Sequence, residues 1–348
     1  MKARALPALL ALGALLLLFL TPRFTDSPYT LHIFILVFLS VVAGQAWNVI
    51  GGLAGQYSVG HAAYYGVGAY TTLILLQSKQ VAPWWGIFPA MLAAVLVALV
   101  IGSICFRLRG PYFVLASIAV AEIMRLSALN WKGVTNGAEG ILANDLPPLK
   151  LGATVITDFL TKVPFYYASL LFAIAAVAAN IAIRRSKLGY YLVAIREDQD
   201  AAHSLGIPLS LYKNLALAIS AAFTALAGAF YAVYIGFIDP GTVLGLDVSV
   251  QFVLVCIIGG IGTVAGPIVG SVVLVLLDEA LRANLIAAGL FKLHLLDEDS
   301  RAGLFLKENL AHAHLLIYGI LVVVVILYMP QGIWGFVRQR FLARGRAR

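Results

Sequence analysis

Charged side chains are scarce in this chain, and residues 184–213 hold the densest group of them within the first 280 residues. The interval reads RRSKLGYYLVAIREDQDAAHSLGIPLSLYK and lies between two long apolar runs. Within it, residues 194–207 predict a short amphipathic helix, which Gly206 would end just before Pro208. Its apolar side would hold Ala194, Ile195, Ala201, Ala202 and Leu205, and its charged side Arg196, Glu197, Asp198 and Asp200. Such a helix would offer a small knob to the groove of a soluble partner.

A second group of polar side chains lies in a glycine-rich stretch. Residues 51–70 read GGLAGQYSVGHAAYYGVGAY. Interrupted helices often make the substrate site of a transporter, because the ends of half-helices expose unpaired backbone groups. Glycines also permit close helix packing, which is the interpretation that we favour for the glycines themselves. For the polar side chains, a pathway lining and a packed interior stay equally open. The candidates for a pathway are Asn48, Gln56, Ser58, His61 and Tyr64.

Glu122 and Arg125 form the clearest ionisable pair in or near an apolar segment, because residues three apart share a helical face. Charges inside a membrane are functional hypotheses by default, so Glu122 joins the candidate pathway residues. The alternative, which we favour, is a structural pair in which Arg125 reaches toward the membrane interface.

Catalytic and metal-binding patterns are weak. Ser58 and His61 are only three residues apart, whereas a serine hydrolase would present its nucleophile in a motif such as G-x-S-x-G with a distant histidine. The stretch that contains His294, His312 and His314 also holds Asp297, Glu298 and Asp299, but His312 and His314 would point to different faces of a helix. We read this stretch as a solvated outer loop, and expect no catalytic residue, no metal site and no cofactor.

The elements that must position these residues are long apolar helices. The chain is 61% hydrophobic and 11% charged, with a mean hydropathy of +0.94, whereas a soluble domain carries about a quarter charged residues. The fold class is therefore an all-α polytopic membrane protein, in one transmembrane domain over residues 1–348. About ten segments approach the length that crosses a bilayer. They are residues 6–20, 30–50, 59–77, 86–106, 111–128, 164–183, 213–235, 249–260, 264–281 and 314–329.

Charge predicts the orientation of these segments. With ten crossings and the N-terminus inside, the inner loops and tails hold 14 Lys and Arg, and the outer ones hold 9. Both termini, the loop 184–213 and the basic tail 338–348 are then cytoplasmic. This arrangement requires the glycine region 259–270 to contain a tight inner turn between two short helices. The net charge of +8 is explained by anionic lipid at the inner leaflet, without nucleic acid.

Two sets of residues carry a resemblance to known families. Asp200-Ala201-Ala202-x-x-x-Gly206 resembles the E-A-A-x-x-x-G loop of bacterial ABC importer permeases, with Asp in place of Glu. Residues 44–282 resemble the LivM-type branched-chain amino acid permeases in four blocks that occur in the same order. The blocks are GLAGQYSVGHAAYY, GPYFVLASIAVAEIMRLSALNWKGVTNGAEGI, AIREDQDAAHSLGI and IDPGTVLGLDVSVQFVLVCIIGGIGTVAGPIVGSVV.

The resemblance implies a type II ABC importer permease with glycine-interrupted helices, in the bacterial inner membrane. It implies as partners a second permease subunit, two ATP-binding cassette subunits and a periplasmic substrate-binding protein. The loop 194–207 would dock on the ATPases. The chain has no G-x-x-x-x-G-K-[ST] phosphate loop of its own, so ATP hydrolysis would need another chain. Trp131 and Asn136, in a turn-rich outer loop, are candidates for a gate or for docking the binding protein.

Two other functions stay open as alternatives. Urea and short-amide ABC permeases resemble the same family, and nothing in the sequence sets the size of a pocket. A secondary transporter that works without ATP would usually carry ionisable residues in mid-span, and Glu122 is the only deep carboxylate. Such a carrier would have no use for the helix at 194–207. The sequence therefore favours an ATP-driven importer of branched-chain or related amino acids.

Overall fold

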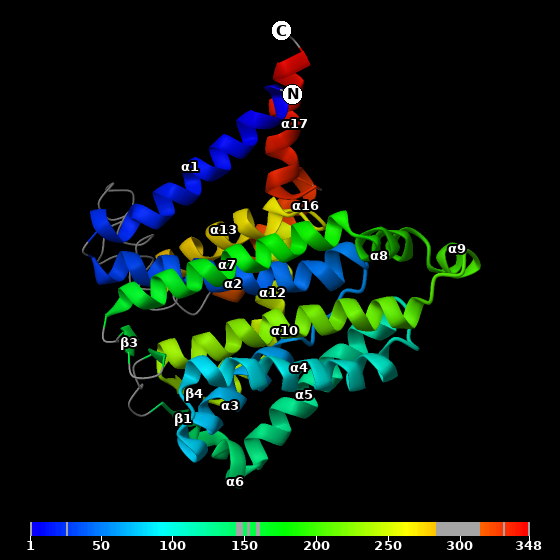
Figure 1. Cartoon of the computed structure of the whole chain (residues 1–348). Helices are drawn as coiled ribbons and strands as arrows, with labels where there is room; N and C mark the ends of the chain where they lie inside the picture. Colours follow the sequence, from blue (N-terminus) through cyan, green and yellow to red (C-terminus); the bar gives the residue numbers. More distant parts are fainter. Residues whose placement is uncertain are drawn as a thin grey trace, which may run out of the picture.

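Long helices run side by side through most of the chain (Figure 1). The computed structural model describes residues 2–25, 27–143, 149–151, 154–157, 161–282, 314–329 and 331–346. The longer helices are α1 Lys2–Phe24, α2 Pro28–Trp47, α3 His61–Lys79, α4 Pro83–Cys105, α5 Pro111–Asn130, α7 Lys162–Arg185, α10 Leu209–Ile235, α12 Leu246–Gly259, α13 Ala265–Arg282, α16 His314–Tyr328 and α17 Gly332–Arg346. Shorter ones are α6 Lys132–Thr135, η2 Gly137–Glu139, α8 Lys187–Glu197, α9 Gln199–Ser204 and α11 Pro240–Leu244.

Each of the ten predicted segments overlaps one of these long helices. Six apolar stretches of the described chain are long enough to cross a bilayer: Pro28–Leu53, Pro83–Cys105, Pro111–Asn130, Lys162–Arg185, Leu209–Ile235 and Pro240–Gly259. The protein is therefore a multi-pass membrane protein, as predicted. The number of ten crossings stays a prediction, and so does the single domain over residues 1–348.

The two glycine regions, which the sequence left ambiguous, differ in structure. In the first, α2 continues without a break into a π-helix, η1 Asn48–Leu53, and the chain then runs irregularly to the start of α3. In the second, residues 260–264 form a turn that joins α12 to α13, as the charge argument required. Gly260 and Gly262 adopt positive φ angles of 123° and 73°, which L-residues with a side chain rarely adopt.

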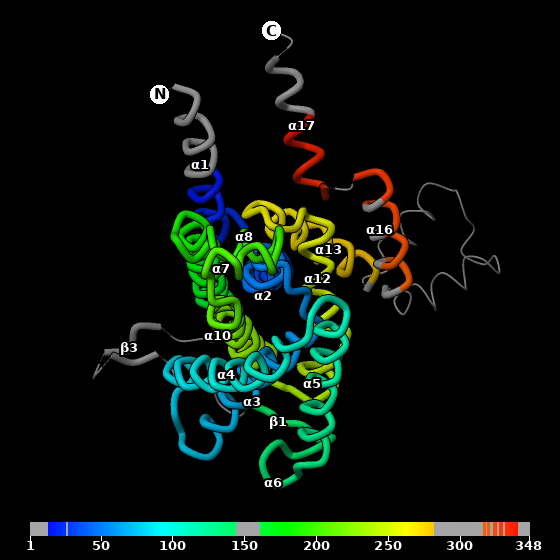
Figure 2. Tube along the Cα trace, turned by 90° about the vertical axis from the view of Figure 1, so that its right-hand side faces the viewer, coloured from blue at the N-terminus to red at the C-terminus, as the bar shows by residue number. Residues whose placement is uncertain are grey.

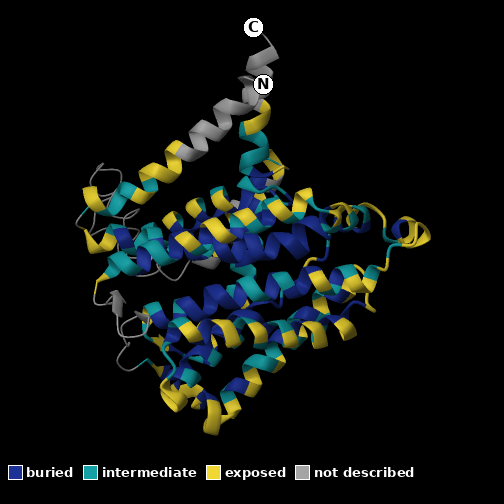
Figure 3. Ribbon diagram, in the orientation of Figure 1, coloured by how far each residue is buried: buried dark blue, intermediate teal, exposed yellow. Residues whose placement is uncertain are grey.

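The core of the bundle surrounds α2 and α10, which are the most deeply buried helices (Figure 3). Trp47, Tyr166 and Phe230 are its largest fully buried side chains. Close approach of α3 and α10 depends on glycine. A Cβ on Gly68 would overlap the backbone carbonyl of Ala225, and one on Gly228 would overlap that of Tyr65. Helix packing is thus what these glycines provide, in agreement with the interpretation favoured from the sequence.

Two small antiparallel sheets qualify the all-α prediction. β1 Ile141–Leu142 pairs with β4 Phe237–Ile238, and β2 Leu149–Leu151 pairs with β3 Thr154–Thr157. The first sheet lies at the end of the bundle opposite α9 (Figure 1). There the chain leaves helices, and pairing satisfies backbone groups that no helix serves. Helix α17 runs across the direction of the long helices in both views (Figures 1 and 2).

Candidate functional site

The predicted helix 194–207 is two helices, and this corrects the prediction from the sequence. α8 ends at Glu197, Asp198 adopts an extended conformation, and α9 begins at Gln199. The Asp198 carboxylate accepts hydrogen bonds from the backbone N–H groups of Asp200 and Ala201, at 2.9 and 3.0 Å. Asp198 therefore acts as the N-cap of α9 and does not belong to a continuous charged face.

The break also changes which side chains are buried. Ile195 and Ala202, two residues of the predicted apolar side, are buried. Ala201 is exposed, and Leu205 is 81% exposed, so the predicted apolar side does not face the bundle as a unit. α9 projects beyond the ends of α7 and α10 (Figure 1). It thus presents a short, partly apolar surface that has no cover among the described residues.

Two basic residues that the sequence did not single out contact the start of α9. Arg109, in the connection between α4 and α5, forms an ion pair with Asp200 at 2.9 Å. Lys213, on α10, is 2% exposed, and its Nζ donates a hydrogen bond to Gln199 Oε1 at 2.8 Å. The ammonium group also lies 5.9 Å from the centre of the Phe106 ring. In the sequence, Arg109 lies in a short segment between two apolar runs, and Lys213 is the last residue of the interval 184–213.

Arg196 connects this loop with the first glycine region. Its Nη1 donates a hydrogen bond to the backbone carbonyl of Gly52 in η1, at 3.0 Å. Its side-chain Nε donates to Glu197 Oε1 at 3.1 Å, so Glu197 orients the guanidinium group. The Cγ of Arg196 lies so near Gly55 that a Cβ there would come within 2.7 Å. Arg196 is therefore a bridge from α8 into the bundle.

Asn48 connects the first glycine region with the second. Its Oδ1 accepts a hydrogen bond from the N–H of Gly262, and its Nδ2 donates to the carbonyl of Thr263, both at 2.8 Å. One turn earlier, Gln45 Nε2 donates to the carbonyl of Val264 at 2.6 Å. Asn48 is fully buried, and a Cβ on Gly52 would overlap its Oδ1. The loop 184–213 and the two glycine regions, far apart in sequence, thus meet at one place.

The other predicted pathway residues lie in the packed interior. His61 places its Nδ1 3.1 Å from Ser58 Oγ and its Nε2 2.8 Å from Ser220 Oγ, and Ser220 donates onward to the carbonyl of Ala46. Tyr64 lies edge-on to the His61 ring, with centroids 5.5 Å apart. Gln56, which is 4% exposed, donates to the carbonyl of Ala54. None of these residues lines either of the two polar cavities near the ends of the described bundle, and a pathway role for them stays a prediction.

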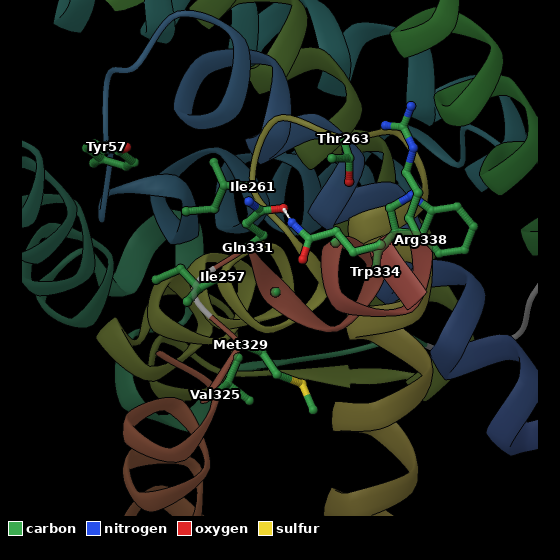
Figure 4. Close-up of a pocket in the computed structure, with 12 residues that line it drawn as sticks. Tyr57, Ile257, Ile261, Thr263, Val325, Met329, Gln331, Trp334 and Arg338 are labelled. Atoms are coloured by element: carbon green, nitrogen blue, oxygen red, sulfur yellow. Dashed lines mark hydrogen bonds between the residues drawn. The ribbon is translucent and has the colours of Figure 1, made fainter. Parts of the chain in front are cut away.

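A cavity of about 700 Å³ adjoins the two glycine regions (Figure 4). Tyr57, Ile261 and Thr263 border it on one side, and the corner between α16 and α17 borders it on the other. From that corner come Trp334 and Arg338, together with Gln331, which accepts a hydrogen bond from Gln339 at 2.8 Å. The irregular backbone of both glycine regions therefore lies beside a polar cavity, where such backbone is tolerated within a membrane.

Glu122 and the two candidates for an outer gate or docking site make only local contacts. Arg125 donates two hydrogen bonds to the Glu122 carboxylate, at 2.9 and 2.6 Å, which is the structural pair that the sequence favoured. Trp131 is 61% exposed. Asn136 adopts a left-handed conformation, with φ of 61°, and its Nδ2 donates to the carbonyl of Gly140. A pathway role for Glu122 and a gating or docking role for Trp131 and Asn136 stay predictions.

The acidic and histidine-rich stretch lies almost wholly outside the described residues, which resume at His314. Within the described ranges, no group of three or more His, Cys, Asp or Glu side chains could hold a metal ion.

Comparison with known proteins decides the family. Residues 29–326 match the model of the branched-chain amino acid transport system permease component. The chain belongs to this family. It is therefore a permease subunit of an ABC importer, and the family is one of transport proteins.

The relatives agree with this assignment. The permease LivM of Escherichia coli (strain K12) is 29% identical over 291 residues, which are 78% of this chain and 68% of LivM. The permease LivH of Salmonella typhimurium is 23% identical over 242 residues, 66% of this chain and 77% of LivH. The autoinducer 2 import permease LsrC of Salmonella paratyphi B is 30% identical over 141 residues, 37% of this chain and 40% of LsrC. No solved structure matches the chain.

Proposed function

We propose that the whole chain is one of two membrane subunits of an ATP-driven importer for branched-chain or related amino acids. It would lie in the bacterial inner membrane with both termini in the cytoplasm. Two ATP-binding cassette subunits would power it, and a periplasmic binding protein would deliver the cargo. The family match and the names of LivM and LivH support the cargo class. The bias of Lys and Arg toward the predicted inner side supports the orientation.

The hydrogen bond from Arg196 to Gly52 carries the mechanistic part of this proposal. ATP-driven closure of the ATPases would move α9, and the exposed Leu205 at its C-cap offers an apolar contact. Arg196 transmits that movement to η1, and Asn48 transmits it onward to the turn between α12 and α13. Chains of packed and hydrogen-bonded groups of this kind can carry coupling between distant sites. The permease itself performs no covalent step; it would switch the pathway from outward-open to inward-open.

Uptake by the reconstituted complex tests the proposal. Proteoliposomes that contain this chain, its second permease, its ATPases and its binding protein are supplied with labelled leucine, with and without ATP. We expect leucine uptake that requires ATP. Labelled urea and acetamide run in parallel, because short-amide permeases were the alternative with the same mechanism. Uptake of urea but not leucine would show that the cargo is urea or a short amide. Leucine uptake without ATP would show that the protein is a secondary transporter.

Glu122 gives a separate test of the pathway. If its carboxylate lines the route, Glu122→Gln lowers leucine uptake while the amount of assembled complex stays the same. The variant also leaves Arg125 without its ion pair, so uptake must be compared at equal amounts of assembled complex to separate a pathway effect from lost stability. Initial uptake rates at matched complex concentrations provide the measurement. Wild-type uptake by this variant would leave Glu122 with its structural role alone.

A further inference from the structure

A second polar cavity, of about 310 Å³, lies between α2, α10, α12 and α13, near the end of the bundle opposite α9. Its walls include Leu36, Leu39, Phe252 and Val275. Tyr65 packs against Phe252 and Tyr231, with ring centroids 5.5 and 5.8 Å apart. The volume is at the lower end of the range for small-molecule sites, and a mostly apolar wall is typical of them. The predicted orientation places this cavity toward the outer face, where an importer first receives its cargo.

Two carboxylates enter the cavity, which is unusual in so apolar a chain. Asp278 and Glu279 lie near the end of α13 and line the cavity together with His32 and Gln251. A carboxylate is the natural partner of an ammonium group. The cavity thus combines an anionic end with an aliphatic wall.

The hydroxyl of Tyr65 gives an independent indication of a ligand. Tyr65 is 7% exposed and lines the cavity, and its hydroxyl hydrogen-bonds no residue of the described chain. Its neighbours are more fully paired: His32 bonds to the Tyr234 hydroxyl, and Ser40 donates to Ser271 Oγ at 3.0 Å. Because Tyr65 lines the cavity, its hydroxyl can donate a hydrogen bond to a ligand bound there. A carboxylate is a strong acceptor for this purpose.

We propose that this cavity binds a zwitterionic aliphatic amino acid inside the permease. Asp278 and Glu279 hold the ammonium group, Tyr65 and the Gln251 amide donate to the carboxylate, and Leu36, Leu39 and Val275 contact the side chain. This inference rests on the proposed import function and refines it. The permease then contributes to selection of the cargo, because urea and neutral amides have no ammonium group for the carboxylates.

Photolabelling of the full reconstituted complex tests the inference. The probe is a leucine analogue with a diazirine in its side chain, and labelled peptides are mapped by mass spectrometry. We expect labelling of α2, α12 or α13 around the cavity, removed by excess leucine and by isoamylamine, but not by isocaproate, which lacks the ammonium group. The double variant Asp278→Asn and Glu279→Gln should lose at least about tenfold in labelling, as expected when a charged hydrogen bond is lost.

Matched variants separate recognition from folding. Asp247→Asn removes a carboxylate on α12 that is exposed and lies outside the cavity. This variant should be labelled as strongly as wild type. Glu279→Asp keeps a carboxylate and should retain most of the labelling that Glu279→Gln loses. Absence of leucine-protected labelling in wild type, or full labelling of the double variant, would overturn the inference. The uptake assay decides the import function independently, so ATP-dependent leucine uptake without protected labelling removes only the cavity assignment.

Discussion

Asn48 shows how a single polar side chain can hold together two segments separated by more than two hundred residues. Its amide uses both its donor and its acceptor on backbone groups of the turn between α12 and α13. Such complete pairing is what allows a buried amide in an apolar interior. The sequence identified Asn48 as a functional candidate, but its partners lie outside any local pattern. Prediction from periodicity cannot find contacts of this range.

Replacing Asn48 with Leu should therefore destabilise the permease. The N–H of Gly262 and the carbonyl of Thr263 would each lose a buried partner, at about 1–3 kcal/mol for each group. Thermal unfolding in detergent measures the change. Asn130→Leu is the matched control, because Asn130 is exposed and bonds only to the carbonyl of Leu126 in its own helix. Equal stability of the two variants would show that the Asn48 bridge contributes nothing.

A substitution of the single residue Arg196 tests the coupling of ATP hydrolysis to transport. Arg196→Met keeps an apolar stem against Gly55 but removes the hydrogen bond to Gly52. We expect fewer leucine molecules transported per ATP hydrolysed, because movement of α8 and α9 would no longer pull on η1. Arg109→Met removes only an exposed ion pair, which is typically worth about 0–1 kcal/mol, and should stay close to wild type. If Arg109→Met reduced the ratio more than Arg196→Met, the transmission route would be wrong.

At the scale of elements, the glycines of α3 and α10 set the distance between the two helices. Gly228→Val would push side-chain carbon into the carbonyl of Tyr65. Overpacking of this kind costs about 1–3 kcal/mol or more, so the variant should unfold at a lower temperature. Gly133→Ala, at a position with open space around it, is the control. If Gly228→Val unfolded at the same temperature as wild type, α3 and α10 could move apart without a loss of stability.

The sequence predicted where the long helices lie, but it predicted less well where helices begin and end. Hydropathy located the helices because crossing a bilayer demands length and apolar composition. The break at Asp198 was missed because the amphipathic pattern continues across it, although aspartate is a favoured N-cap and could have signalled the start of α9. Leu205 was assigned to the same apolar side as Ile195 for the same reason, although only Ile195 is buried. The strands β1 and β4 join segments almost a hundred residues apart, which no local pattern reveals.

At the scale of the whole molecule, two polar cavities bordered by described residues lie toward opposite ends, and buried hydrogen-bonded groups lie among the helices between them. The first adjoins the junction of Arg196, Asn48 and the glycine turn, and the second is lined by the carboxylates of α13. In the orientation that we propose, the first is the inner cavity and the second is the outer one. An importer that alternates between outward-open and inward-open states needs recognition outside and coupling inside. The arrangement suits that division.

Gly206 gives the most direct test of ATP coupling through α9, and α10 supplies its own control. Gly206 and Gly236 flank α10, share a φ of 82°, and have no atom within 4 Å of the position that a Cβ would take. Leucine at either position brings similar backbone strain, but only Gly206 adjoins α9. The measurement is leucine transported per ATP hydrolysed by the reconstituted complex. We predict that Gly206→Leu lowers this ratio severalfold and that Gly236→Leu preserves it; normal coupling in Gly206→Leu, or equal loss in both, would contradict the account.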